Sequence, residues 1–208
     1  TFTDREGDPH SPRLLGFWRV QILNVYYYAR EAAKAETLAK FAPDLPEDRL
    51  DRQPLYGAGG RFLLVADCRI DNRPELAEAL GIEPARAAAM ADSAFVLAAW
   101  ERWEAACLDR LAGNFAFAVW DEARHALHLV RDGTADRPLF YHSGAGRFAF
   151  ASMAKGLHAL PDIPIAANLD QLRDMLALAP HGGTASLFAG VSRVEPGTRV
   201  TIHADGRL

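Results

Sequence analysis

The strongest constraint on the fold is the segment Leu111–Asp121, where apolar side chains follow a two-residue period. The alternating residues are Phe115, Ala116, Phe117, Ala118, Val119 and Trp120. This is the period of a β-strand, and apolar residues on both of its faces indicate a strand inside a layered structure. A polar turn at 121–125 separates it from a second apolar run at 126–130, which predicts a hairpin. Short strands at 139–141 and 148–150 complete the prediction of a central antiparallel sheet.

The rest of the chain alternates between strand and helix patterns. Strands are predicted at Leu14–Tyr28, Arg61–Ala66, Leu187–Val191 and Arg199–Ile202, and helices at Ala29–Phe41, Pro74–Leu80, Ser93–Leu108 and Asn168–Leu178. Pro74 suits a first helical turn and Gly81 a helix end, while Asn168 with Gln171 predicts a helix N-cap. Thr1–Arg13 is polar, with little pattern, and is expected to be irregular. This order of elements favours an α+β fold with helices packed on antiparallel sheets.

Composition excludes several functional classes. Half of the 208 residues are hydrophobic and the net charge is −4 with interspersed signs, so we expect no nucleic-acid partner and no membrane association. Cys68 and Cys107 lie in apolar patterns and are interpreted as buried free thiols of a cytoplasmic protein. The seven histidines, including His125 and His128, lack metal-ligand spacing, so no metal site is predicted. Gly57–Gly60 precedes a strand and has no lysine after it, which predicts a turn and not a phosphate loop.

A series of motifs, in order and at consistent spacing, resembles the glutaminase domain of asparagine synthetases. The series comprises Leu63–Asn72, Ala91–Ser93, Ala98–Trp103, Cys107–Asp121, Leu129–Asp132, Arg137–Tyr141 and Phe150–Ser152, with Gln53–Tyr56 before it and Leu187–Val191 and Val194–Gly197 after it. The resemblance implies a four-layer αββα sandwich of the N-terminal-nucleophile hydrolase class. In that family a cysteine at the mature N-terminus attacks the side-chain amide of glutamine, and the released ammonia passes to an ATP-using domain.

The sequence departs from this family at the reactive centre. No cysteine occupies position 1; Thr1 is a conceivable nucleophile, but a hydroxyl is weaker than a thiol and the residues after it are polar. We therefore predict no catalytic residue. The family's pocket motif, Asn-Gly-Glu, is replaced by Asp67, Cys68 and Arg69. An ionised aspartate accepts hydrogen bonds where the oxyanion needs a donor, cysteine adds bulk in place of glycine, and arginine reverses the charge of glutamate.

Two further pocket residues are left open by the sequence. Asp92 matches the family aspartate that holds the α-amine of glutamine, and it would serve equally well as the N-cap of the helix that follows. The pocket arginine of the family has no secure match; Arg49 and Arg52 are candidates. The vestigial substrate pocket is thus predicted to comprise Asp67, Cys68, Arg69 and Asp92.

Three functional hypotheses follow. In the first, residues 1–208 form a glutaminase-inactive domain, as in β-lactam synthetases and lasso-peptide cyclases, that is a scaffold for an ATP-dependent amide-forming synthetase domain. That domain would carry the ATP and Mg²⁺, with no cofactor here, because no Ser-Gly-Gly-containing ATP motif occurs in the chain. In the second, an active domain has an N-terminal cysteine missing from this sequence. In the third, the chain is a stand-alone amino-acid or peptide-binding module. Glutamine and a second copy of the chain are further candidate partners.

Overall fold

The computed structural model describes residues 50–144, 147–160, 163–179 and 182–203. These residues fall into two compact units, one made of 50–139 with 194–203 and the other of 140–193; each is described by itself. The strand expected at Leu14–Tyr28, the helix expected at Ala29–Phe41 and the irregular segment Thr1–Arg13 lie outside the described residues. Within the described parts, helices and antiparallel sheets occur together, so the α+β class is confirmed.

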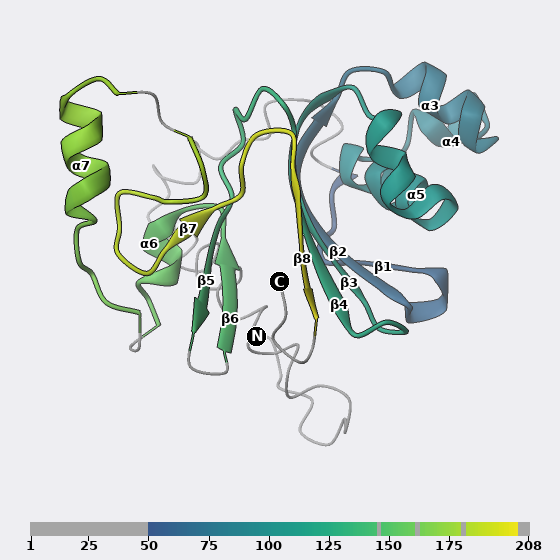
Figure 1. The fold of residues 1–208 in the computed structure, drawn as a ribbon. Helices are drawn as coiled ribbons and strands as arrows, with labels where there is room; N and C mark the ends of the chain where they lie inside the picture. Colours follow the sequence, from purple (N-terminus) through teal and green to yellow (C-terminus); the bar gives the residue numbers. More distant parts are fainter. Residues whose placement is uncertain (1–49, 145–146, 161–162, 180–181, 204–208) are drawn as a thin grey trace, which may run out of the picture. The chain divides into compact units, whose positions relative to one another are not determined.

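The first unit contains a five-stranded antiparallel sheet in the order β1-β2-β3-β4-β8 (Figure 1). Its strands are β1 (Leu55–Gly57), β2 (Phe62–Ile70), β3 (Gly113–Asp121), β4 (Ala126–Arg131) and β8 (Arg199–His203). β2 pairs with β3 from Phe62 opposite Asp121 to Ile70 opposite Gly113. β2 therefore extends four residues beyond the strand predicted to end at Ala66, and this extension contains three of the four predicted pocket residues.

Helices cover one face of this sheet. They are α3 (Arg73–Leu80), α4 (Pro84–Ala87) and α5 (Asp92–Trp103), followed by the 3-10 helix η4 (Glu104–Asp109); a second 3-10 turn, η3 (Ala58–Gly60), joins β1 to β2. The core between α5 and the sheet is built around Phe62, Phe95, Trp100 and Phe117, each at most 2% exposed. The opposite sheet face is also apolar, with buried residues such as Ala118 and Leu129, as the period of Leu111–Asp121 predicts.

The second unit contains a three-stranded sheet in the order β6-β5-β7. Its elements are β5 (Phe140–Gly144), β6 (Arg147–Ala151), α6 (Ala154–Leu157), α7 (Leu169–Leu176) and β7 (Ser192–Arg193). The strands at 115–130 and those at 140–151 belong to different sheets, so they do not form the one central sheet that periodicity alone suggests; two antiparallel sheets are present, as the αββα class implies. The predicted strand at Leu187–Val191 is wrong, because this segment makes only an isolated bridge between Ala167 and Phe188.

Helix boundaries follow local signals closely. Gly81 ends α3 with a φ of 68°, a left-handed conformation that glycine adopts without steric cost. Asn168 caps α7 by accepting a hydrogen bond from the Gln171 N–H at 3.3 Å, as predicted. The helix predicted at Ser93–Leu108 ends earlier, at Trp103, because Glu104 has a φ of 48° and the chain continues as η4.

Candidate functional site

The carboxyl-terminal half of β2 separates the predicted pocket residues onto two faces of the sheet. Cys68 packs against the core on the helix side. Because side chains alternate along a strand, Asp67 and Arg69 lie on the opposite face, where both are exposed. Asp92 joins Cys68 on the helix side, since its carboxylate accepts a hydrogen bond from the Ile70 N–H at 2.8 Å. The structure thus groups the four residues at one end of β2 but not around one cavity.

Asp92 is held by an internal ion pair. Its side chain is 5% exposed, and its second carboxylate oxygen pairs with the Arg73 guanidinium. The same guanidinium donates to the carbonyls of Met90 at 2.8 Å and Ala87 at 3.1 Å, so it is fixed from three directions. Asp92 is the first residue of α5, whose N-cap is Ala91; the expectation that Asp92 is the cap residue itself is therefore wrong. Its carboxylate links β2 to α3.

Cys68 has an unreactive environment. The thiol is half-buried, so the expectation of a fully buried residue is wrong for Cys68 and correct for Cys107. Burial raises the pKa of Cys68 well above its ordinary value, and the nearby carboxylates of Asp92, Asp51 and Asp67 raise it further. Burial likewise raises the pKa of Cys107 to about 12. Both thiols are therefore protonated at neutral pH, whereas nucleophilic attack requires a thiolate.

Asp67 and Arg69 are both engaged with neighbouring charges. Asp67 pairs with Arg137 at 3.0 Å, and Arg69 pairs with Asp71 at 2.9 Å. All four side chains are at least 40% exposed, so each pair contributes little to stability. The pairs do, however, balance the local charge. At the position that the family uses to stabilise an oxyanion, this face presents a carboxylate already matched by a cation.

The loop that carries Arg137 is rigidly organised. Buried Asp132 accepts hydrogen bonds from the backbone N–H groups of Thr134 at 2.7 Å and of Phe115 and Ala135 at 3.0 Å. Burial raises the pKa of Asp132, but a hydrogen bond from the Thr134 hydroxyl, together with these backbone bonds, outweighs it and leaves the pKa below its usual value. Arg131 donates to the carbonyls of Ala135 and Arg137 on the other side of the loop.

Gly113 permits a close approach between β3 and the end of β2. Its φ is 144°, and a Cβ atom at this position would overlap the carbonyl oxygen of Arg69. Beside it, Asn114 stands opposite Arg69 in the strand register and donates to Asp136 at 2.7 Å. Sequence reasoning did not select Arg73, Arg137 or Asn114 as site residues, although all three lie within or beside the quoted motifs.

The remaining candidates do not enlarge the site. Thr1 and Arg49 lie outside the described residues, and the Arg52 guanidinium donates to the carbonyl of Asp51 at 2.9 Å. His125 is exposed in a turn, whereas His128 is buried in β4 with its Nδ1 3.1 Å from the Thr201 hydroxyl. Across the described ranges, no group of three or more histidine, cysteine, aspartate or glutamate side chains is arranged to hold a metal ion.

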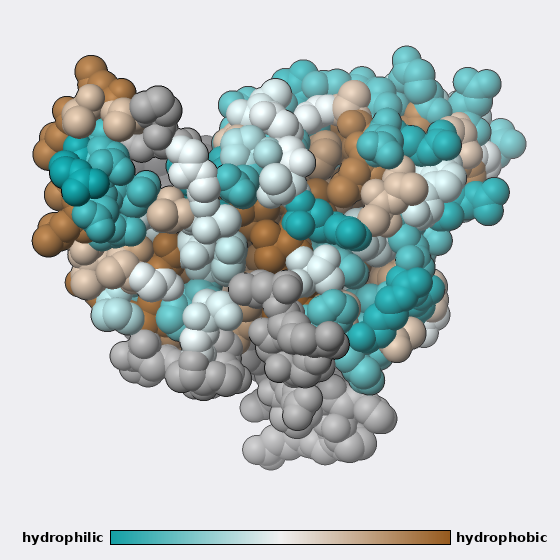
Figure 2. Space-filling model, viewed as in Figure 1, coloured by the Kyte–Doolittle hydropathy of each residue, from teal (hydrophilic) through white to brown (hydrophobic). Residues whose placement is uncertain are grey.

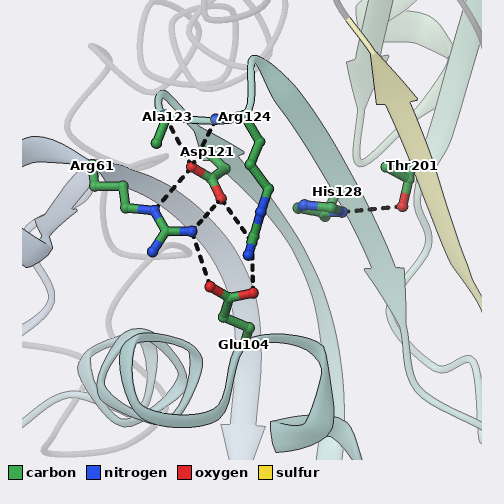
Figure 3. Close-up of polar contacts among 7 residues, drawn as sticks. All are labelled: Arg61, Glu104, Asp121, Ala123, Arg124, His128 and Thr201. Carbon is green, nitrogen blue, oxygen red and sulfur yellow. Dashed lines mark hydrogen bonds and ion pairs between the residues drawn. The ribbon is translucent and has the colours of Figure 1, made fainter.

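A charged cluster at the opposite end of β2 was not anticipated from the sequence (Figure 3). Asp121 is 1% exposed and binds Arg61 at 2.8 Å and Arg124 at 3.1 Å, and Glu104 pairs with the same two arginines. Burial raises the pKa of Asp121, but Arg61 and the Arg124 N–H together lower it below its usual value. The cluster joins the β3–β4 turn to β2 and to the start of η4. The cluster has a structural role and adds no catalytic group to the site.

These features define an α+β domain in which the residues predicted for the pocket lie together at one end of β2 and are held by ion pairs and hydrogen bonds within the domain. Residues 46–208 match the glutamine amidotransferase domain family, so the chain belongs to that family, as the resemblance predicted. In the described ranges, no helix has the length and apolar character needed to cross a membrane.

Three asparagine synthetases illustrate the relationship. Asparagine synthetase [glutamine-hydrolyzing] 3 of Bacillus subtilis is 30% identical over 74% of this chain and 26% of its own length. Asparagine synthetase [glutamine-hydrolyzing] 1 of that organism is 31% identical over 75% and 24%, and the putative enzyme of Mycobacterium tuberculosis is 35% identical over 71% and 23%. The chain thus spans about a quarter of the length of these relatives. Among solved structures, glutamine phosphoribosylpyrophosphate amidotransferase from B. subtilis aligns with a TM-score of 0.49, at 16% identity, over 75% of this chain and 30% of that chain.

Proposed function

We propose that this domain does not hydrolyse glutamine and acts instead as a scaffold for an ATP-dependent amide-forming synthetase domain. The observation that carries the proposal is that the Asp92 carboxylate is buried and already occupied by partners within the domain. A carboxylate that binds the α-amine of glutamine must be open to the substrate, but this one is 5% exposed and shared between Arg73 and the Ile70 N–H. A substrate ammonium group would have to displace the part-buried Arg73 guanidinium, which is unfavourable because that cation would lose its partner.

The end of β2 supports the same conclusion from a second direction. Stabilising a tetrahedral oxyanion requires hydrogen-bond donors directed at the developing charge. Asp67 presents a carboxylate and Cys68 presents a protonated thiol directed into the helix-side core. The positive charge of Arg137 is already matched by Asp67. No pair of these groups reproduces an amide donor beside an open glycine backbone.

The partner in this proposal is the ATP-using domain itself. The relatives named above are called glutamine-hydrolysing asparagine synthetases and are about four times as long as the matched region. ATP and Mg²⁺ would bind on that additional part, and this domain would hold no cofactor. Both cysteines are unpaired thiols, which supports a reducing, cytoplasmic setting for the assembly.

Glutaminase activity tests the proposal. The full polypeptide, prepared with its natural N-terminus, would be mixed with glutamine and ATP, and ammonia and glutamate would be quantified. Asparagine synthetase 3 of B. subtilis serves as the positive control. We expect no release above the rate without enzyme, also in the variant D67N/C68G/R69E, because Asp92 remains engaged by Arg73. Turnover by the unmodified polypeptide comparable with that of the control would refute the proposal and favour a working amidotransferase.

A further inference from the structure

Large apolar side chains on the described surface concentrate in one region of the second unit. Of nine large hydrophobic residues that the described chain exposes, seven lie between 153 and 188. The most exposed four are Ile165, Leu169, Leu176 and Leu178, between 73% and 90% exposed. These four residues are named here the α7 surface. Exposed leucines scattered singly need no explanation, but several on and around one short helix indicate an interaction site.

The α7 surface takes two of its four residues, Leu169 and Leu176, from an amphipathic helix that has no buried residue. Leu169 and Leu176 are seven residues apart and therefore share one face of α7, whereas Leu172 and Met175 are half-buried. Figure 2 shows hydrophobic residues along one side of α7 and hydrophilic residues along another. An isolated helix of eight residues is marginal in water, because most helical stability in proteins comes from packing an apolar face. Covering this face would stabilise α7.

Charge on α7 excludes two kinds of partner. Its only cation, Arg173, pairs with Asp170 at 3.2 Å and with Asp174 at 3.0 Å. Helices that lie on anionic membranes present clusters of lysine and arginine beside their apolar face, and nucleic acid requires a basic patch. α7 provides neither. Its apolar residues and mutually paired charges suit the apolar surface of a protein.

The size of the α7 surface favours a linked partner over a second copy of the chain. α7 is about 12 Å long at 1.5 Å per residue, and four apolar side chains are far fewer than the roughly 20–30 residues that each partner contributes to a stable interface between separate proteins. A domain joined to this one by a peptide linker experiences a high effective concentration, so a small apolar contact suffices. The matched relatives contain such additional length.

We propose that the α7 surface is the docking site for the synthetase domain of the same polypeptide. The inference rests on the proposed scaffold function and adds the surface through which the scaffold acts. In the assembled protein, Leu169 and Leu176 are buried against an apolar patch of the synthetase domain, and α7 becomes protected.

Hydrogen–deuterium exchange of residues 165–178 tests this docking site in the 208-residue chain and in the full polypeptide. We expect exchange to be slower in the full polypeptide by roughly tenfold or more. Leu176→Glu should abolish the difference, because it places a charge in the apolar contact. Ala79→Glu, which adds the same charge on the exposed side of α3, should preserve it. Circular dichroism of both variants establishes that they are folded.

Four results would overturn the docking proposal. These are equal exchange in the two proteins, slow exchange in the 208-residue chain at every concentration, slowing that depends on its concentration, and a reading frame that encodes no synthetase domain. The second result would show that another part of this chain covers the α7 surface. The third would show that a second copy of the chain covers it. Ammonia release by the full polypeptide is measured separately: turnover would refute the inactive-glutaminase proposal while leaving the exchange result interpretable.

Discussion

Removing the charge of Arg73 is expected to destabilise the domain more than removing the charge of its partner, Asp92. The two side chains form one ion pair between α3 and the start of α5, but they differ in burial: Asp92 is 5% exposed and Arg73 is 21% exposed. The loss in free energy of unfolding depends on which charged residue remains without its partner. Arg73→Met strands the more deeply buried charge, whereas Asp92→Asn strands a guanidinium that water can reach.

The contacts around the pair set the magnitudes. After Arg73→Met, the Asp92 carboxylate keeps only the Ile70 N–H among the bonds described above, and breaking a buried pair in this way costs about 3–5 kcal/mol. After Asp92→Asn, the amide oxygen still accepts from Ile70, and Arg73 keeps its bonds to Met90 and Ala87. Losing one charged hydrogen bond then costs about 1.5–3 kcal/mol. The double variant should cost less than the sum, by about 1 kcal/mol or more.

Urea denaturation followed by tryptophan fluorescence measures these differences. Trp100, Trp103 and Trp120 all lie in the unit that contains the pair, so their signal reports on its unfolding. With an unchanged m-value, the shift of the midpoint gives the change in free energy of unfolding. The reasoning is refuted if both single variants lie within about 0.5 kcal/mol of the parent. Asp92 would then have no structural partner and would be available to bind an amine.

Three further predictions concern His128, the ion pairs of Asp121, and the thiol of Cys68. Burial lowers the pKa of His128 from 6.5 to about 4, so the unfolded chain binds its proton more readily; stability is full above pH 6.5 and falls by up to about 3 kcal/mol towards pH 4. His128→Phe should flatten this dependence of the urea midpoint, and an unchanged slope would contradict it. Asp121→Ala should cost about 3 kcal/mol, because it removes a 1% exposed carboxylate that accepts hydrogen bonds from Arg61, Arg124 and the Ala123 N–H. Arg124→Ala removes a 55% exposed side chain and should cost clearly less; equal losses in thermal unfolding would contradict a structural role for the buried carboxylate. Cys68, measured in a Cys107→Ala background, should react with a chromogenic disulfide at pH 8 far more slowly in the folded protein than in urea, since burial raises the pKa of its thiol; equal rates would show an open thiol.

Local sequence signals were sufficient for elements that are stabilised within themselves. Pro74 and Gly81 mark the limits of α3, and Asn168 with Gln171 marks the start of α7. The two-residue period of Leu111–Asp121 predicted β3 with both faces buried. In each case the decisive interaction joins residues close in sequence or repeats along one element.

Contacts between distant residues account for what the sequence did not predict. α5 stops at Trp103 although the apolar spacing continues, and Glu104 at that end is held by Arg61 and Arg124. The division of β3 and β5 between two sheets likewise depends on tertiary pairing. Neither feature has a signal within a short window of sequence.

The candidate site also depends on contacts between residues that are far apart in the sequence. The sequence identified Asp92 and correctly placed it at the mouth of a helix, but its partner, Arg73, lies 19 residues away and faces it only once α3 is packed. Arg137 pairs with Asp67 across an even longer separation. A family motif can therefore name the residues of a pocket, while the state of each residue depends on charges that other elements bring to it.

Calorimetric titration of the full polypeptide with glutamine tests the central claim most directly, because binding precedes hydrolysis and needs no assumption about the nucleophile. Asp92 is engaged by Arg73, so the account predicts no saturable heat with glutamine at any concentration up to its solubility limit. Saturable binding of glutamine at one site per chain would contradict the claim that this pocket no longer accepts the substrate of the family.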